Sequence, residues 1–378
     1  MDVAAAEETL QGGYLVTGSD WEMSVGWIRS AGVSSSGSIQ WIDSLGCGMS
    51  TTLCNQMIRT SWGQFALIGQ SLGSQGGGML YLLMDHQGNV ITEHGYGVAG
   101  PGAYLSGQDI KETAGGFIIA CHGNVYGNGA RLMRVDGSGN EIWSSEASGD
   151  QWDVFRAVVE LSEGGYAAAG YTKNNDQYDY LVSRFSPAGD PIWSCSPGDP
   201  VERDMACDLV ETSDGGILVC GTRWVDGYSD LDICLVKLTA DGTQEWEYLM
   251  GGPLPERASA LRTLPNNRYI VLGTAENTGG TNDIVLVEFT IDTAQGAGEE
   301  SGEHHCFITC SPNPCRGSVN ITAGMPEGVH GTLEVFDLSG RRVTGSIAVT
   351  GQENHTVSWI DDPLVPGVYL ARVQGGEH

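Results

Sequence analysis

Aspartates recur at one position of a repeating pattern in the chain, where they could do chemistry. They are Asp179, Asp232 and Asp283, which stand near the ends of the polar loops TKNNDQYDY, TRWVDGYSDLD and AENTGGTND, just before an expected third strand. Paired carboxylates can act as acid and base in glycoside hydrolysis, and clustered carboxylates can bind calcium. The simplest interpretation is structural, because an aspartate before a strand accepts hydrogen bonds from nearby backbone N–H groups.

Arginines recur in a second set of loops, each placed before an expected strand. The loops are GDQWDVFRA, SPGDPVERD and GGPLPERA, and the residues are Arg156, Arg203 and Arg257. Such a set could pair with glutamates to brace neighbouring units, or it could form a binding surface. Bracing is the preferred interpretation.

Familiar catalytic and metal-binding signatures are absent from the sequence. There is no H-E-x-x-H, G-x-S-x-G, Walker loop or G-x-G-x-x-G that opens a helix. The sequence holds no D-x-[DN]-x-[DN]-G loop, so calcium binding is an alternative that no motif supports. We predict no catalytic, cofactor-binding or metal-binding residue, and we interpret scattered histidines such as His122 as packing or surface residues.

A repeat of about fifty residues must position these side chains. The stretch YDYLVSRFSPAGDPIW, which ends at Trp193, has counterparts that end at Trp41, Thr92, Trp143 and Trp246. In each copy a glycine stands four residues before the closing position. These turn glycines are Gly37, Gly88, Gly139, Gly189 and Gly242. The period predicts a propeller or a solenoid.

A second signal divides each repeat into strands. Motifs such as GGYLVTG, GGYAAAG and GGILVCG read as second strands, each preceded by a strand-like run such as MACDLVETS. Each unit therefore predicts four antiparallel strands, the pattern of a propeller blade, and radial closure would hide edges and apolar faces. We expect Trp143, Trp193 and Trp246 to be buried as wedges between blades.

The six repeated units predict an all-β, six-bladed β-propeller, or an incomplete seven-bladed one. The sixth unit lacks a clear fourth strand, so we expect an N-terminus that is incomplete or a blade of three strands. The propeller is predicted over residues 1–293, a Gly/Glu-rich linker over 294–304, and a small immunoglobulin-like sandwich over 305–378.

The charge of the chain limits its partners. With 18 basic and 47 acidic residues the formal net charge is −29, so nucleic acid and anionic membranes are poor partners. No run is long and apolar enough to span a bilayer, and residues after Met1 lack the features of a signal peptide. The protein is either cytosolic or encoded by a longer gene.

The ten cysteines form no zinc-binding spacing. We interpret Cys207, Cys220 and Cys234, on three successive expected strands, as compact core residues. A disulfide is more plausible among Cys306, Cys310 and Cys315 in an oxidising location.

Three ordered motifs in the last part of the chain resemble a known family. They are SPNP, LEVFDLSGRRV and LVPGVYLARV. The tail is similar to the C-terminal sorting domain (Por secretion tail) of proteins exported by the type IX secretion system of Bacteroidetes-like bacteria. The matching residues are Ser311, Pro312, Asn313, Pro314, Asp337, Gly340, Arg341, Gly367 and Tyr369. The resemblance implies an immunoglobulin-like domain that the secretion machinery recognises. The family's usual last basic strand is missing after QGGEH, so we expect a shortened C-terminus.

Together these features predict a secreted or cell-surface, non-catalytic propeller that binds protein or glycan. The alternative is an extracellular, glycosidase-like hydrolase with its site at the central mouth of the propeller. The sequence does not identify the ligand.

Overall fold

The computed structural model describes two compact units, residues 1–197 and 198–378, which we treat separately. The described residues are 2–22, 25–45, 51–73, 76–97, 103–124, 129–147, 152–174, 177–199, 201–225, 230–251, 255–276, 282–291, 307–311, 319–324, 330–337, 342, 347–350, 355–359 and 369–375. All regular elements in these ranges are strands, and none of the ranges holds a helix suited to span a membrane.

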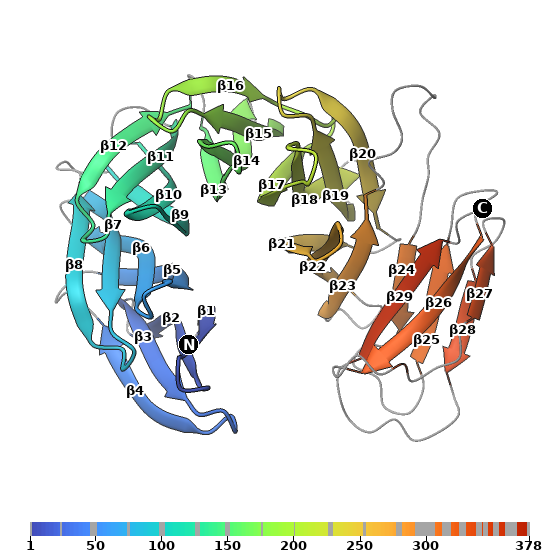
Figure 1. The fold of residues 1–378 in the computed structure, drawn as a ribbon, viewed down its shortest axis with the longest axis horizontal. Helices are drawn as coiled ribbons and strands as arrows, with labels where there is room; N and C mark the ends of the chain where they lie inside the picture. Colours follow the sequence, from blue (N-terminus) through green and yellow to red (C-terminus); the bar gives the residue numbers. More distant parts are fainter. Residues whose placement is uncertain are drawn as a thin grey trace. The chain divides into compact units, whose positions relative to one another are not determined.

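The first unit consists of four sheets, each made of four consecutive antiparallel strands. Sheet 1 holds β1 (Asp2–Glu8), β2 (Tyr14–Glu22), β3 (Val25–Val33) and β4 (Ile39–Leu45). Sheet 2 holds β5 (Thr51–Arg59), β6 (Phe65–Gly73), β7 (Gly76–Met84) and β8 (Val90–Gly97). Sheet 3 holds β9 (Leu105–Thr113), β10 (Gly116–Gly123), β11 (Gly129–Asp136) and β12 (Glu141–Glu146). Sheet 4 holds β13 (Val154–Glu160), β14 (Tyr166–Asn174), β15 (Gln177–Phe185) and β16 (Pro191–Cys195). The first strands of neighbouring sheets contact each other, and the fourth strand of each sheet lies at the far side of the sheet from these contacts (Figure 1).

The second unit begins with two sheets of the same kind. Sheet 5 holds β17 (Asp204–Glu211), β18 (Ile217–Val225), β19 (Asp230–Leu238) and β20 (Gln244–Met250). Sheet 6 holds β21 (Glu256–Leu264), β22 (Arg268–Glu276) and β23 (Asn282–Thr290). The predicted strand order is therefore confirmed in five four-stranded sheets, and the described part of the sixth has three strands.

Two three-stranded sheets follow in the C-terminal part of the second unit. One pairs β24 (Phe307–Ser311), β25 (Val319–Gly324) and β28 (His355–Trp359). The other pairs β27 (Ile347–Thr350), β26 (His330–Asp337) and β29 (Tyr369–Gly375). Asp337 and Tyr369, from two of the motifs of the tail, are direct partners across β26 and β29. Ser311 ends β24, whereas Pro312, Asn313, Pro314, Gly340, Arg341 and Gly367 lie outside the described residues.

Each of the six first strands contains a β-bulge at the same place. The bulged residues are Ala4, Asn55, Gln108, Arg156, Cys207 and Ser259. The glycine that closes most second-strand motifs faces this bulge, and a Cβ on Gly170 would overlap the carbonyl oxygen of Val154. Sheet 3 has Cys121 at that position, and there the opposite strand supplies the glycine, Gly107. The sequence signal thus reflects a close approach of two backbones.

Apolar side chains from neighbouring sheets form shared cores within each unit. One core joins sheets 3 and 4 through buried residues such as Ile118, Phe155 and Phe185, and Trp143 packs against it. The prediction that the closing tryptophans are buried was wrong in degree, because Trp143, Trp193 and Trp246 are only half-buried. They belong to the last strand of each sheet, at its edge, so each indole ring stays partly exposed to solvent.

Carboxylates of the first strands also join neighbouring sheets. Buried Asp109 of β9 accepts a hydrogen bond from the backbone N–H of Val158 in β13, with Oδ2 3.0 Å from the nitrogen. In the second unit, Asp208 of β17 accepts one from the N–H of Leu261 in β21 at 2.8 Å. These two residues occupy the same place after the bulge, so the contact is part of the repeat.

Candidate functional site

The structure divides the six predicted loop residues between the two units. Asp179 lies in β15, Asp232 in β19 and Asp283 in β23, each within the first residues of a third strand. Arg156 lies in β13, Arg203 directly before β17, and Arg257 in β21. Two of the six, Arg156 and Asp232, belong to clusters of side chains that could bind a ligand.

The larger cluster lies where sheets 3 and 4 meet. It combines tyrosine rings with cationic and imidazole side chains from six positions along the chain. We call it the aromatic–cationic cluster, and it consists of Tyr104, His122, Arg156, Tyr171, Lys173 and Tyr178.

Sheet 3 contributes a tyrosine and a histidine. Tyr104, just before β9, exchanges two hydrogen bonds with Asn124: its N–H donates to Asn124 Oδ1 at 2.8 Å, and its carbonyl accepts from the Asn124 N–H at 3.1 Å. This pair fixes the Tyr104 ring at the end of β10, edge-on to the ring of His122 with centroids 5.7 Å apart.

Sheet 4 contributes two cations that lie on two tyrosine rings. The guanidinium of Arg156 is 5.5 Å from the centroid of the Tyr171 ring, and the ammonium of Lys173 is 5.2 Å from that of Tyr178. The two tyrosine rings are themselves 5.5 Å apart and nearly perpendicular. Arg156 is the bulged residue of β13, and a bulge re-aims a side chain in this way.

Electrostatic effects connect the two halves of the cluster. Burial, helped by the positive charge of Arg156, lowers the pKa of His122 to about 4. Burial is also the main cause of the raised pKa of Tyr104, and Tyr171 adds to it. His122 is therefore neutral at pH 7, and within the described residues its buried Nδ1 has no hydrogen-bond partner.

A buried carboxyl group contacts β14 at Thr172, on the opposite face of the strand from Tyr171 and Lys173. Asp153, directly before β13, is 5% exposed, and its burial raises its pKa despite a hydrogen bond with the side chain of Thr172. Thr172 stands between Tyr171 and Lys173 in β14, and the backbone N–H of Lys173 donates to the carbonyl of Trp152 at 3.1 Å. Asp153 Oδ1 has no hydrogen-bond partner in the described part of the chain.

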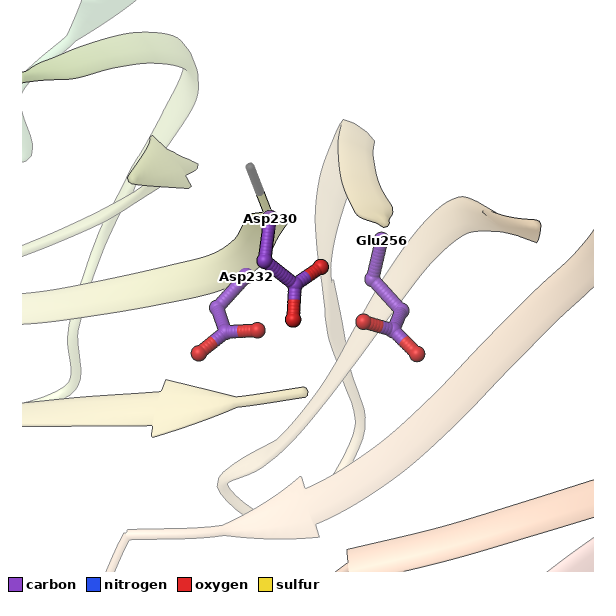
Figure 2. Close-up of side chains that lie close together, drawn as sticks. All are labelled: Asp230, Asp232 and Glu256. Carbon is purple, nitrogen blue, oxygen red and sulfur yellow. The ribbon is translucent and has the colours of Figure 1, made fainter. Parts of the chain in front are cut away.

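The smaller cluster is a group of three carboxylates in the second unit. Asp230 and Asp232, two residues apart on β19, meet Glu256 at the start of β21, and one oxygen from each lies within 4.8 Å of the others. Asp230 lies between the other two (Figure 2). Carboxylate oxygens are the ligands that Ca²⁺ prefers, but calcium takes six to eight of them. The three residues could supply part of such a site.

The sequence identified Arg156 and Asp232 but not their neighbours. Tyr104, His122 and Tyr171 are far apart in the chain, and only the register of the sheets brings them together. The repeated D-x-x-E-T of DIKET and DLVET could have revealed Asp109 and Asp208, each of which bonds to a backbone N–H of the next sheet.

Residues 310–378 match the family described as the secretion system C-terminal sorting domain. The chain therefore carries a C-terminal sorting domain, as its three motifs predicted. It belongs to the class of secreted proteins that become attached to the outer cell surface. No curated protein matches the chain in sequence.

Several solved structures show a weak likeness. A subtype N10 neuraminidase-like protein of A/little yellow-shouldered bat/Guatemala has 9% identity and a TM-score of 0.49, covering 78% of this chain and 96% of its own. Polysaccharide lyase Uly1 has 11% identity and a TM-score of 0.47, covering 75% and 76%. Sqt1 from Chaetomium thermophilum has 12% identity and a TM-score of 0.44, covering 74% and 82%. Likeness at this level assigns no activity to the chain.

Proposed function

We propose that the chain is a secreted, surface-attached β-propeller that binds an extracellular glycan without transforming it. In this proposal residues 1–293 form six blades, or part of seven, from sheets 1 to 6. Residues 294–304 are a linker, and residues 305–378 form an immunoglobulin-like domain recognised by the type IX machinery. Repeated four-stranded sheets with shared apolar cores support the propeller, because radial closure covers such faces.

The aromatic–cationic cluster is the observation that carries the binding function. Half-buried tyrosine rings can pack on the C–H faces of a sugar ring, while neighbouring polar groups fix its orientation by hydrogen bonds. Here the rings of Tyr171 and Tyr178 contact each other, and the guanidinium of Arg156, an exposed residue, lies over the ring of Tyr171. This combination of apolar faces and directed donors suits a saccharide.

The charges of the cluster favour an acidic saccharide. Two of the chain's 18 basic residues, Arg156 and Lys173, gather here on a protein with a net charge of −29. A carboxylate or sulfate group on the glycan would pair with the guanidinium of Arg156, which recognises such groups through its fork of N–H donors. Binding to such a glycan should weaken as salt is added.

The test is a binding assay on an array of neutral and acidic glycans, followed by calorimetry on the best ligand. Tyr171→Ala and Arg156→Ala should each lower affinity about tenfold or more. Tyr14→Ala is the matched control, because Tyr14 is an exposed tyrosine of sheet 1, outside the cluster. Loss of affinity in the control alone, or no binding to any glycan, contradicts the proposal.

The alternative, an extracellular glycosidase-like hydrolase, is favoured by one observation. A buried carboxyl with a raised pKa, such as Asp153, can stay protonated and act as a general acid. Incubation of the full chain with the bound glycan and measurement of new reducing ends separates the two functions. Release of product that Asp153→Asn abolishes establishes a hydrolase; binding without product supports the non-catalytic protein.

A further inference from the structure

Two cysteine sulfurs lie in contact inside sheet 5. The Sγ atoms of Cys207 in β17 and Cys220 in β18 are 3.4 Å apart. Cys207 is the bulged residue of β17, and its neighbour Asp208 is the one paired with Cys220. Because a bulge sets two residues against one, Cys207 and Asp208 together oppose Cys220, and the two thiols meet.

The repeat itself does not require this pair of thiols. At the same two positions, none of the five other bulged first strands and their second-strand partners has a cysteine; in sheet 1 the pair is Ala4 with Thr17, and in the other four the second residue is aliphatic. These four pairs are Asn55 with Ile68, Gln108 with Ala120, Arg156 with Ala169, and Ser259 with Leu272, with the aliphatic residue opposite the one that follows the bulge. A cysteine at both positions is therefore a property of sheet 5 among these sheets.

The third cysteine of sheet 5 is placed differently. Cys234 of β19 pairs with Gly221, the neighbour of Cys220. Successive residues of a strand face opposite sides of the sheet, so Cys234 lies on the other face from Cys220. The apolar core beside sheet 6 accordingly includes Cys220, with Cys207 packed against it. Cys207 is thus the thiol within reach of Cys220.

The sorting domain sets the chemical environment of this pair. A protein exported to the outer cell surface passes through an oxidising compartment, where nearby thiols form disulfides. We propose that Cys207 and Cys220 form a disulfide in the exported protein, a role that is independent of the proposed glycan binding. The two thiols give up two protons and two electrons as the S–S bond forms, and the disulfide of an exported thiol oxidoreductase is reduced to its dithiol.

The bond must form before sheet 5 closes. Cys220 is fully buried, and a hydrogen bond with Cys207 together with burial raises the pKa of its thiol well above the ordinary value. The reactive thiolate is therefore scarce in the folded protein. Once formed, the bond ties the β17–β18 hairpin and restricts the unfolded chain, so it should stabilise the second unit.

Peptide mapping of the full chain from the medium or surface of a secreting host tests this proposal. The protein is denatured with an alkylating agent and without reductant, then cut by trypsin and a glutamate-specific protease. Trypsin leaves both cysteines between Arg203 and Arg223, and cleavage after Glu211 separates them. A linked pair of peptides that separates on reduction is the expected result, with Cys54 and Cys121 alkylated as buried single-thiol controls.

A stability measurement gives a second readout. Reductant should lower the melting temperature of the native protein by about 5 °C and leave that of Cys207→Ser unchanged. Alkylation of both Cys207 and Cys220 before reduction overturns the proposal. A link from Cys220 to any cysteine other than Cys207 overturns it equally.

Discussion

The indole ring of Trp143, at the end of sheet 3, covers Gly189 in the β15–β16 turn of sheet 4. A Cβ added to Gly189 would lie 2.7 Å from Cε3 of the ring, closer than real Cβ atoms come. Trp41 of sheet 1 covers Gly88 of sheet 2 in the same way. The spaced glycines and tryptophans of the sequence are therefore two sides of one contact between neighbouring sheets.

Alanine at Gly189 should cost more stability than alanine at Gly37. Both turn glycines have positive φ, 91° and 82°, so an alanine at either costs about 1 kcal/mol in backbone strain. Gly37 has open space around its Cβ direction, whereas Gly189 meets the indole ring. The collision should add about 1–3 kcal/mol for Gly189→Ala.

Urea unfolding of both variants measures this difference. In a Trp143→Ala background the extra cost of Gly189→Ala should largely disappear, because the ring that causes it is gone. Equal costs for Gly37→Ala and Gly189→Ala would show that Gly189 and Trp143 do not compete for space. The same conclusion would follow if the costs of Gly189→Ala and Trp143→Ala simply added in the double variant.

Asp109 should stabilise the first unit far more than an exposed aspartate does. Its buried carboxylate accepts hydrogen bonds from the N–H groups of Val158 and Ile110 and from the ammonium of Lys111. Asp109→Ala leaves these donors without their acceptor and should cost about 2–4 kcal/mol of unfolding free energy. The control is Asp43→Ala, since Asp43 is exposed and accepts one bond from Ser44. Thermal or urea unfolding that gives the same small loss for both would contradict the bridging role.

The sequence could predict the strands and the turns, because each depends on local residue types. Gly189 and Gly88 occupy the expected turn positions, and five sheets have the expected four strands. The bulge at Arg156 could not be predicted in this way. A run such as VFRAVVE pairs equally well with or without an extra residue, and the close contact of Gly170 with Val154 decides the matter in three dimensions.

The aromatic–cationic cluster was missed for a related reason. Arg156 was a candidate, but its partner Tyr171 belongs to another strand and His122 to another sheet. Which ring the guanidinium meets depends on strand register and on the bulge that turns it. A single sequence therefore supplied one member of the site and not the site itself.

His122 should make the stability of the protein depend on pH between about 4 and 6.5. Burial and Arg156 lower its pKa from 6.5 in the unfolded chain to about 4 in the folded one, so the unfolded state binds the proton first. The stabilising contribution is complete above pH 6.5 and is lost as the pH falls towards 4. The loss should be about 2 kcal/mol, allowing for partial solvent screening.

Urea unfolding at several pH values measures this dependence. His122→Gln should flatten the pH profile in that window, while His86→Gln, at an exposed turn position, should leave it unchanged. Arg156→Ala should raise the pKa of His122 in an NMR titration, because a neighbouring positive charge is removed. A profile with the same slope in His122→Gln would assign the dependence to other groups.

Export should depend on the C-terminal domain and not on the repeated sheets. Its residues 310–378 match the sorting-domain family, and the sheets before it have their own apolar cores. In a host with the type IX machinery, a version of the gene product that ends at Gly298 should fold yet remain in the periplasm. Circular dichroism of the recovered protein checks its folding, and fractionation of cells checks its location.

The reciprocal experiment attaches residues 299–378 to a reporter protein that carries its own signal peptide for transport across the inner membrane. The reporter should reach the cell surface, because the machinery recognises the tail and not its cargo. A variant with Leu333→Asp, which places a charge at a fully buried position of β26, should reduce that display, since an unpaired buried charge destabilises the domain. Surface display of the chain without its tail, at the level of the full chain, would reject the sorting role of residues 310–378.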